Sequence, residues 1–322
     1  MSAIARERFL VTGCAGFIGG HLLRRLIGEG LEVVGVDNFA TGLRENIEDL
    51  SGKFDFIEGD LCDPEIAAKA CRGVTHILHQ AAIPSVPRSL KDPLASLHAS
   101  ATATVTLLEA ARKEGVRRLV QAGSSSAYGD SKTLPKVETM TPRPMSPYAV
   151  SKLAQEQFAF AYAKCFGIDT ATFRYFNVFG PRQNPNSAYA AVIPKFITML
   201  MAGKQPTIDG DGLQSRDFTY IDNVVEANLL AARHPEPLQG ETFNVACGQR
   251  TTLLELMDLL NEFLGTDIKS LHTESRAGDV KHSQACIEKI SATLGYKPVV
   301  LFREGVRRTV EYFKNRAVNA IG

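Results

Sequence analysis

The first half of the chain alternates short β-rich runs with amphipathic helical runs. Apolar, β-branched stretches predict strands at residues 8–12, 31–36, 54–57, 74–78, 118–122 and 170–175. The apolar periodicity predicts helices over 17–28, over about 93–114 and from about 147. Strands that alternate with helices form right-handed βαβ units around a parallel sheet that is covered on both faces. We therefore predict an α/β fold with a doubly wound parallel sheet.

The composition changes after residue 180. Residues 181–217 are rich in Pro, Gly, Asn and Asp around one expected helix, 192–202. Thr252 and Glu255 have the spacing of a capping box at the start of a further helix. Residues 218–220, a helix over 222–233 and residues 243–245 are expected to return the chain to the sheet. The predicted division is a large domain of residues 1–180 plus about 217–247, and a smaller, discontinuous α/β lobe of about 181–216 and 248–322.

Charge and composition exclude several classes of partner. The 322 residues carry 36 Lys+Arg against 35 Asp+Glu, with no basic run, which argues against nucleic acid and anionic membranes. No apolar stretch has the length of a membrane span, and no signal-peptide apolar region precedes the first strand. The six cysteines have neither paired nor metal-like spacing. We expect a cytoplasmic protein without a metal site that acts on a small molecule.

Three glycines, Gly13, Gly16 and Gly19, lie between the first strand and the first helix. Glycines are needed there for the tight turn, for close approach to a pyrophosphate and for helix–strand packing, and the helix N-terminus favours phosphate. Asp37 ends the second strand, where a carboxylate binds the ribose 2′-hydroxyl and repels a 2′-phosphate. The large domain is therefore predicted to be a Rossmann-type domain that binds NAD rather than NADP.

Two further groups follow the third and fourth strands. Asp60-Leu61 and Gln80-Ala81-Ala82 occupy strand carboxyl ends, where ligands bind in such sheets. Asp60 could instead cap a helix. We expect both groups to contact the cofactor.

Tyr148 and Lys152 stand one helical turn apart, with Ser124 about two dozen residues upstream. A free phenol has a pKa of about 10 and is a poor base at neutral pH. A positive charge nearby favours the phenolate, and a serine hydroxyl that reaches the same substrate oxygen completes a proton-transfer site. These three residues are the predicted catalytic set.

The Gly-x-x-Gly-x-x-Gly spacing, together with the Ser/Tyr/Lys set, resembles the extended short-chain dehydrogenase/reductase family over essentially the whole chain. Residues 35–42, 79–89 and 174–180 are similar to the UDP-hexose 4-epimerase branch. Residues 186–194, Asn-Ser-Ala-Tyr-Ala-Ala-Val-Ile-Pro, resemble UDP-N-acetylglucosamine 4-epimerases more than general UDP-galactose 4-epimerases. The resemblance implies epimerisation at C4 of a UDP-hexose through a transient 4-keto sugar, with NAD as the cofactor.

The resemblance also implies the remaining contacts. For the cofactor these are Phe17, Ile18, Asn38, Phe39, Thr41, Gly42, Tyr148, Lys152 and Tyr175. For the UDP-sugar they are Ser85, Val86, Ser125, Ser126, Asn177, Gln183, Ala191, Val192, Lys195, Thr207, Ile208, Arg216, Arg276, Asp279 and Ser283. Arg216 and Arg276 would bind the diphosphate, since guanidinium groups bind phosphate oxygens in a bidentate way; each could alternatively form a surface ion pair. Lys195 could be a solvated helix residue.

Ser283 aligns with the family position beside the C2 substituent of the sugar. A tyrosine there restricts related enzymes to plain hexoses, whereas serine leaves room for an N-acetyl group. The resemblance therefore implies turnover of UDP-GlcNAc and UDP-GalNAc alongside UDP-Glc and UDP-Gal. It gives neither the preferred hexose nor the pathway served, for example polysaccharide assembly.

Other activities of the family need different residues. Dehydratases carry Asp-Glu, and UDP-glucuronate decarboxylases a glutamate, where this chain has Ser125 and Ser126. A UDP-glucuronate 4-epimerase stays open as an alternative, as does an inactive NAD-binding sensor. Ser100 stands where the family usually has an asparagine near the nicotinamide.

The resemblance implies that the chain forms a homodimer through a four-helix bundle. Apolar stripes on the helices at 93–114 and 147–166 fit such an interface, and packing on the sheet fits them equally. Their residues are Leu107, Leu108, Ala111, Leu153, Phe158, Phe160 and Tyr162.

Overall fold

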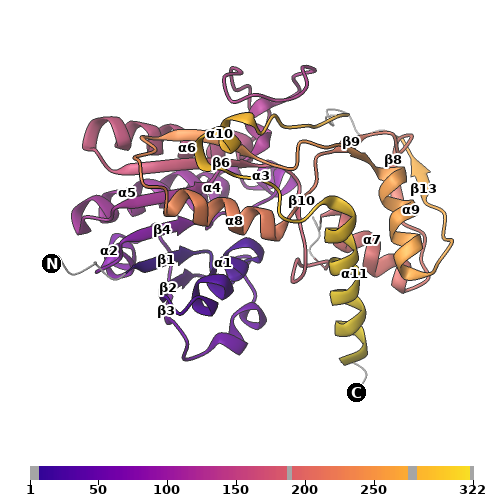
Figure 1. The fold of residues 1–322 in the computed structure, drawn as a ribbon, viewed down its shortest axis with the longest axis horizontal. Helices are drawn as coiled ribbons and strands as arrows, with labels where there is room; N and C mark the ends of the chain where they lie inside the picture. The colour runs from indigo at the N-terminus through magenta and orange to yellow at the C-terminus, as the bar shows by residue number, and fades with distance from the viewer. Residues whose placement is uncertain (1–6, 187–190, 275–280, 320–322) are drawn as a thin grey trace. The chain divides into compact units, whose positions relative to one another are not determined.

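The computed structural model describes residues 7–186, 191–274 and 281–319, and most of its helices and strands are labelled in Figure 1. The chain divides into two compact units. The first consists of Met1–Ala127, Pro144–Arg174 and Val225–Phe243. The second consists of Tyr128–Arg143, Tyr175–Val224 and Asn244–Gly322.

A seven-stranded sheet with the order β11-β6-β5-β4-β1-β2-β3 is the centre of the first unit. Its strands are β1 (Arg8–Thr12), β2 (Glu32–Asp37), β3 (Asp55–Glu58), β4 (His76–His79), β5 (Arg118–Ala122), β6 (Asp169–Tyr175) and β11 (Glu241–Val245). The pairings from β6 to β3 are all parallel, so the predicted doubly wound α/β fold is confirmed. The strand order reverses between β1 and β4, the switch point at which such sheets bind ligands.

Helices cover the sheet, which explains why strands such as β1, β4, β5 and β6 are almost continuously buried. They are α1 (Phe17–Gly28), α2 (Pro64–Cys71), α3 (Val86–Lys91), α4 (Pro93–Leu97), α5 (Ala103–Glu114), α6 (Pro147–Phe166) and α8 (Ile221–Ala232). Short 3-10 turns are formed by Arg44–Asn46, Glu48–Leu50 and Ser125–Tyr128. Leu107, Leu108 and Ala111 of α5 lie in the core with residues of β1, β2 and α2, so this stripe packs within the chain.

The single helix predicted over about 93–114 is interrupted. Between α4 and α5, His98–Thr102 form one π-helical turn, which adds a residue to the turn and shifts the apolar face. Ser100 is buried in this turn, and its hydroxyl has no hydrogen-bond partner among the residues that the structure describes. Apolar periodicity does not reveal such an insertion, because a single extra residue leaves the pattern on each side intact.

The second unit is built from two-stranded pairs and helices. Its strands are β7 (Val178–Phe179), β8 (Thr207–Asp209), β9 (Ser215–Arg216), β10 (Thr219–Tyr220), β12 (Thr251–Thr252) and β13 (Leu271–Thr273), and its helices are α7 (Val192–Met201), α9 (Leu253–Leu264), α10 (Glu288–Leu294) and α11 (Phe302–Asn319). The predicted capping box is confirmed: Thr252 accepts from the Glu255 backbone, and Glu255 accepts from the Thr252 backbone. The expectation that residues 218–220 rejoin the main sheet is wrong, because β10 pairs with β7 instead.

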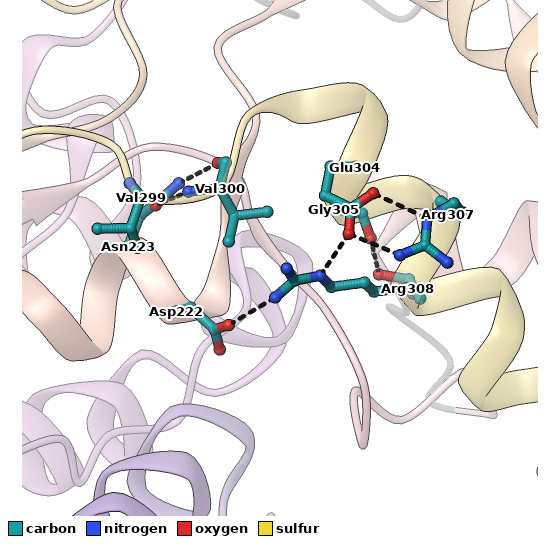
Figure 2. A network of polar contacts seen from close by, with 9 residues as sticks. Asp222, Asn223, Val299, Val300, Glu304, Gly305, Arg307 and Arg308 are labelled. Carbon is teal, nitrogen blue, oxygen red and sulfur yellow. Dashed lines mark hydrogen bonds and ion pairs between the residues drawn. The ribbon is translucent and has the colours of Figure 1, made fainter.

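A polar network joins the start of α8 to the chain that leads into α11 (Figure 2). The buried Asn223 side chain accepts from the backbone N–H groups of Val299 at 2.7 Å and Val300 at 2.9 Å, and donates to the Val300 carbonyl at 2.7 Å. Arg308 bonds Asp222 and Glu304 nearby. Because buried backbone groups need partners, the Asn223 amide fixes this irregular segment.

None of the helices in the described part of the chain is long and apolar enough to span a bilayer.

Candidate active site

The start of α6 sets the positions of two of the predicted catalytic residues. Ser146 is the N-cap and accepts from the Ala149 backbone at 3.2 Å, and Pro147 occupies the first helical position. Tyr148 therefore lies in the first turn and Lys152 one turn later, on the same face. Lys152 is buried.

The chain after β5 supplies the other side of this site. The Lys152 ammonium donates to the carbonyl of Ala122, the last residue of β5, at 2.9 Å. Ser124 is hydrogen-bonded to the Tyr148 phenol, and its Oγ lies 2.7 Å from the Ser126 hydroxyl. The three residues predicted to be catalytic are thus brought together within the first unit.

Burial is the largest influence on the pKa values of Tyr148 and Lys152. It raises the pKa of the Tyr148 phenol, and the hydrogen bond with Ser124 opposes that rise. Burial also lowers the pKa of Lys152 to about 7. The sequence predicted a phenolate favoured by the lysine charge; the structure adds that a charge on either group alone is costly.

The glycine-rich loop brings two backbones into close contact at the switch point. Gly13 has φ of 63°, and a Cβ there would lie 2.9 Å from Ala81 Cα, in the loop after β4. A Cβ on Gly19 would lie 2.1 Å from the Gly13 carbonyl oxygen, so α1 needs glycine to approach β1. Gly16, the N-cap of α1, has no side chain that could accept from the first-turn N–H groups. These groups remain available to a phosphate, as predicted for a dinucleotide.

Asp37 is held in place by backbone N–H groups. Ala15 donates to Oδ2 at 2.9 Å and Phe39 donates to Oδ1 at 2.8 Å. Burial raises the pKa of Asp37, and these hydrogen bonds oppose the rise. A carboxylate offers about four lone-pair sites, so Asp37 can still accept from a ribose hydroxyl in addition to its backbone donors. The position fits an unphosphorylated adenosine ribose.

The alternative that Asp60 caps a helix is wrong. Asp63 is the N-cap of α2, whereas Asp60 accepts from the Cys62 backbone at 2.8 Å and from the Asn38 side chain at 3.1 Å. Asp60 therefore joins the loops after β2 and β3. Ser85, in turn, accepts from the Arg88 backbone at 3.1 Å as the N-cap of α3.

In the second unit, the structure brings Arg216 next to Ser283. The Ser283 N–H donates to the Ser215 carbonyl at 3.0 Å, and the Ser215 N–H donates to the Lys281 carbonyl at 2.9 Å. The Arg216 guanidinium donates to the Ser215 and Lys281 carbonyls at 3.0 and 3.1 Å. The cation and the small hydroxyl residue that the sequence predicted to bind one ligand thus lie on neighbouring segments of the second unit.

Asp217 holds this arrangement together, and the sequence did not single it out. It is fully buried and accepts from the backbone of Cys247 at 3.0 Å and of Ala285 at 3.1 Å. Its carbonyl accepts from the Asn177 side chain at 3.1 Å. Burial raises the pKa of Asp217 to about 6. In the sequence, only the position of Asp217 directly after Arg216, a candidate phosphate-binding residue, points to this role.

Other residues predicted to bind substrate differ in accessibility. Thr207 and Lys195 are exposed, and the Ile208 side chain is buried. Gln183 donates to the Val178 carbonyl at 3.1 Å. Arg276 and Asp279 lie outside the described residues. Across residues 7–186, 191–274 and 281–319, no group of three or more His, Cys, Asp or Glu residues could hold a metal ion.

Comparison with known proteins identifies the family to which this chain is similar. The model of the NAD dependent epimerase/dehydratase family matches residues 9–246. UDP-glucose 4-epimerase of Mycolicibacterium smegmatis is 36% identical over 314 residues, which cover 96% of this chain and 99% of that protein.

Two solved structures are similar throughout. UDP-N-acetylglucosamine 4-epimerase of Methanobrevibacter ruminantium M1, in complex with UDP-N-acetylmuramic acid, is 35% identical with a TM-score of 0.91, covering 97% of this chain and 99% of that one. UDP-glucuronic acid 4-epimerase of Bacillus cereus, in complex with UDP-glucuronic acid and NAD, is 33% identical with a TM-score of 0.89, covering 96% and 99%.

Proposed function

Because the chain belongs to the NAD dependent epimerase/dehydratase family, we propose that it is a UDP-sugar 4-epimerase. Its cofactor is NAD, and the phosphate-accepting loop and Asp37 fit that cofactor. The observation that carries the proposal is the hydrogen-bonded pair of Ser124 and Tyr148, one helical turn from the buried Lys152. The relatives named as UDP-sugar 4-epimerases, which match this chain over nearly its whole length, support the same reaction.

The proposed reaction is a transient oxidation at C4. When bound, NAD supplies the acceptor for the C4 hydride and returns that hydride in the second half of the reaction. Tyr148, as the phenolate, accepts the proton of the sugar 4-hydroxyl, and Ser124 donates a hydrogen bond to the same oxygen. Lys152 keeps the phenolate charge paired. The resulting 4-keto sugar turns over while Arg216 and Arg276 hold the diphosphate, so that C4 would present its opposite face to the returning hydride, and Tyr148 returns the proton to the 4-oxygen. Net redox is zero.

Ser125 and Ser126 support epimerisation over elimination. Both are half-buried beside Ser124, and neither can act as the carboxylic acid or carboxylate that loss of water across C5–C6 requires. Each hydroxyl can instead bind the sugar. The same argument disfavours decarboxylation of a UDP-glucuronate.

We propose that N-acetylated and plain UDP-hexoses are both substrates. The Ser283→Tyr variant is expected to lose turnover of UDP-GlcNAc at least about 100-fold, because a phenol fills the space of the acetamido group. Turnover of UDP-Glc should change less than about threefold. The measurement is kcat/KM for both sugars on the same preparations, with Ser283→Ala as the matched small variant. Equal loss for both sugars contradicts the assignment of Ser283.

A UDP-glucuronate 4-epimerase is the alternative substrate assignment, and the similar Bacillus cereus structure favours it. Its 6-carboxylate needs polar partners, which hydroxyl groups such as those of Ser125 and Ser126 can supply. Incubation with UDP-glucuronate and NMR of the product distinguishes the two. Inversion of UDP-glucuronate faster than that of UDP-GlcNAc and UDP-Glc would select this alternative.

We also propose a homodimer whose interface is formed by α3, α4 and α6 of the first unit. Leu90 (67% exposed), Leu94 (65%), Val150 (50%) and Phe158 (42%) leave apolar surface on these helices, which pack against one another. By contrast, the α5 stripe is buried in the chain's own core. Exposed apolar surface of this kind is typical of an interface, and a second copy matches it by two-fold symmetry.

The double variant Leu90→Lys/Leu94→Lys is expected to weaken the dimer at least about 100-fold, because it buries like charges in place of apolar area. Sedimentation velocity measures the dissociation constant. Val318→Lys, at another exposed apolar residue (70%), is the control and should remain dimeric. A double variant as dimeric as the wild type rules out this face.

A further inference from the structure

A chain of buried polar side chains lies behind the glycine-rich loop and the catalytic helix, all within the first unit. His79, the last residue of β4, lies 2.7 Å by Nδ1 from the Thr12 hydroxyl and 2.9 Å by Nε2 from the Thr104 hydroxyl of α5. Gln155 of α6 donates to the same Thr104 oxygen at 2.6 Å. Thr12, His79, Thr104 and Gln155 are all buried. The chain of contacts therefore runs from β1 to the helix that carries Tyr148.

The hydrogen bonds of Thr12 determine the tautomer of His79. The Thr12 oxygen already accepts from the backbone N–H groups of Gln80 at 3.1 Å and Ala81 at 3.2 Å. A hydroxyl oxygen has two lone pairs, so the Thr12 O–H must donate to His79 Nδ1. The proton of the imidazole is then on Nε2, which lies 2.9 Å from the Thr104 hydroxyl and 3.4 Å from the Gln155 amide nitrogen. A proton on Nδ1 would leave the buried Thr12 hydroxyl without an acceptor and give its oxygen a third donor.

The charge near His79 favours the same neutral form. Burial, followed by the positive charge of Lys152, lowers the pKa of His79 to about 3. Lys152 is the charged group whose field reaches His79 from α6, and the side chains within hydrogen-bond distance of the imidazole, Thr12, Thr104 and Gln155, do not titrate. The imidazole is therefore a fixed donor–acceptor pair rather than a proton carrier.

Gln155 is tied to the sheet through its backbone as well. The Gln121 amide of β5 donates to the Gln155 carbonyl at 2.9 Å and to the Thr172 hydroxyl of β6 at 2.8 Å. Gln155 stands three residues after Lys152 on α6, so these bonds fix the helix just beyond the catalytic turn. At the other end of this series of polar contacts, the Thr12 hydroxyl fixes the Gln80-Ala81 backbone, which lies against Gly13.

We propose that His79 is a positioning residue that couples the cofactor loop to the register of the catalytic helix, acting as the neutral Nε2–H tautomer between Thr12 and Thr104. The inference rests on the proposed function only where turnover is measured. Loss of this link should weaken NAD binding and lower kcat together. The KM for the UDP-sugar should stay unchanged, because none of these side chains binds the sugar.

The tautomer is tested directly on the holoenzyme, without turnover. Long-range ¹H–¹⁵N spectra of ¹⁵N-histidine-labelled protein distinguish Nδ1–H, Nε2–H and imidazolium, and the His79 signals are those that disappear in the His79→Gln variant. We expect Nε2–H at every pH between 6 and 9. An Nδ1–H pattern, or titration of His79 within this range, overturns the proposal.

The coupling is tested with two matched threonine variants. Thr104→Val removes the hydroxyl between His79 and Gln155. Thr170→Val removes another buried hydroxyl that bonds α6, through the Ala159 carbonyl at 2.8 Å, but lies outside the His79 chain. We expect Thr104→Val to lower kcat and NAD affinity about tenfold each, with an unchanged KM, and Thr170→Val to alter neither. Equal effects of the two variants on kcat and NAD affinity overturn the proposal.

Two substitutions of His79 distinguish a hydrogen-bonding role from a packing role. The amide of His79→Gln keeps a donor near the position of Nε2, whereas His79→Leu has none. The glutamine variant should retain several times more NAD affinity and kcat than the leucine variant at comparable melting temperatures. If the two variants are equally impaired, His79 acts only through packing. Since NAD affinity is measured by titration without sugar, these results stand even if the proposed substrate is wrong.

Discussion

The Tyr148→Phe variant is expected to lose about 10²–10⁴-fold in kcat for C4 epimerisation, the range contributed by a positioned general base. The substitution removes a single oxygen, the one hydrogen-bonded to Ser124, and leaves the ring in its buried site. Binding of NAD and of the UDP-sugar should stay within about threefold of the wild type, since neither anchor is altered. Initial rates by NMR, with binding by calorimetry, test both statements.

Tyr162→Phe is the matched control for this variant. Tyr162 lies on the same helix, and its hydroxyl donates to Glu109 at 2.8 Å, away from Ser124 and Lys152. It should be fully active. A Tyr148→Phe enzyme with undiminished epimerisation would contradict the catalytic assignment, and an undiminished cellular function without epimerisation would favour the NAD-binding sensor.

The Lys152→Met variant is expected to combine a large loss of activity with a gain in stability. Without the ammonium the phenolate loses its paired charge, so kcat should fall at least about 100-fold. In the cofactor-free protein the buried lysine is destabilising, since burial lowers its pKa from 10.5 to about 7. Methionine is similar in length and carries no charge, and it leaves the Ala122 carbonyl one donor short, at a cost of roughly 1 kcal/mol. The net stability should rise by a few kcal/mol near neutral pH.

The stability difference between the wild type and Lys152→Met should depend on pH, because the pKa of Lys152 differs between the folded and unfolded chain. Between pH 7 and 10.5 the unfolded chain binds a proton at Lys152 that the folded chain does not. The destabilisation is therefore complete below pH 7 and is lost as the pH rises toward 10.5, at up to about 1.4 kcal/mol per pH unit. Urea unfolding of cofactor-free wild type and variant from pH 6 to 9 measures the difference, which should narrow as the pH rises. A constant difference, or a variant less stable at pH 6, contradicts the account.

The sequence predicted those features that depend on residues close together in the chain or on the position of a residue at the end of a strand. Gly13 and Asp37 stand at the ends of the adjacent strands β1 and β2, which topology brings to one edge of the sheet, and Gly19 lies in the helix that follows β1. Tyr148 and Lys152 follow a proline and a serine that start a helix, so their shared face could be inferred from spacing. Ser124 follows β5, and the structure joins it to Tyr148.

Features that depend on contacts distant in sequence could not be predicted in the same way. The π turn at 98–102 leaves the apolar pattern on each side unchanged. Pairing of β10 with β7 instead of the main sheet concerns runs of two residues, too short to carry a periodicity. The role of Asp217 comes from backbone donors 30 and 68 residues away. The tautomer of His79 requires Thr12 and Thr104, from separate elements, to be placed beside it.

The most direct test of the proposed function is NMR of the purified protein with UDP-GlcNAc, UDP-Glc and UDP-glucuronate, each without added cofactor. We expect the first two sugars to reach an equilibrium with their C4 epimers, with bound NAD sufficient for many turnovers and no accumulation of NADH. Stoichiometric release of NADH, or retention of configuration at C4 in every sugar while NAD is bound, would contradict the assignment.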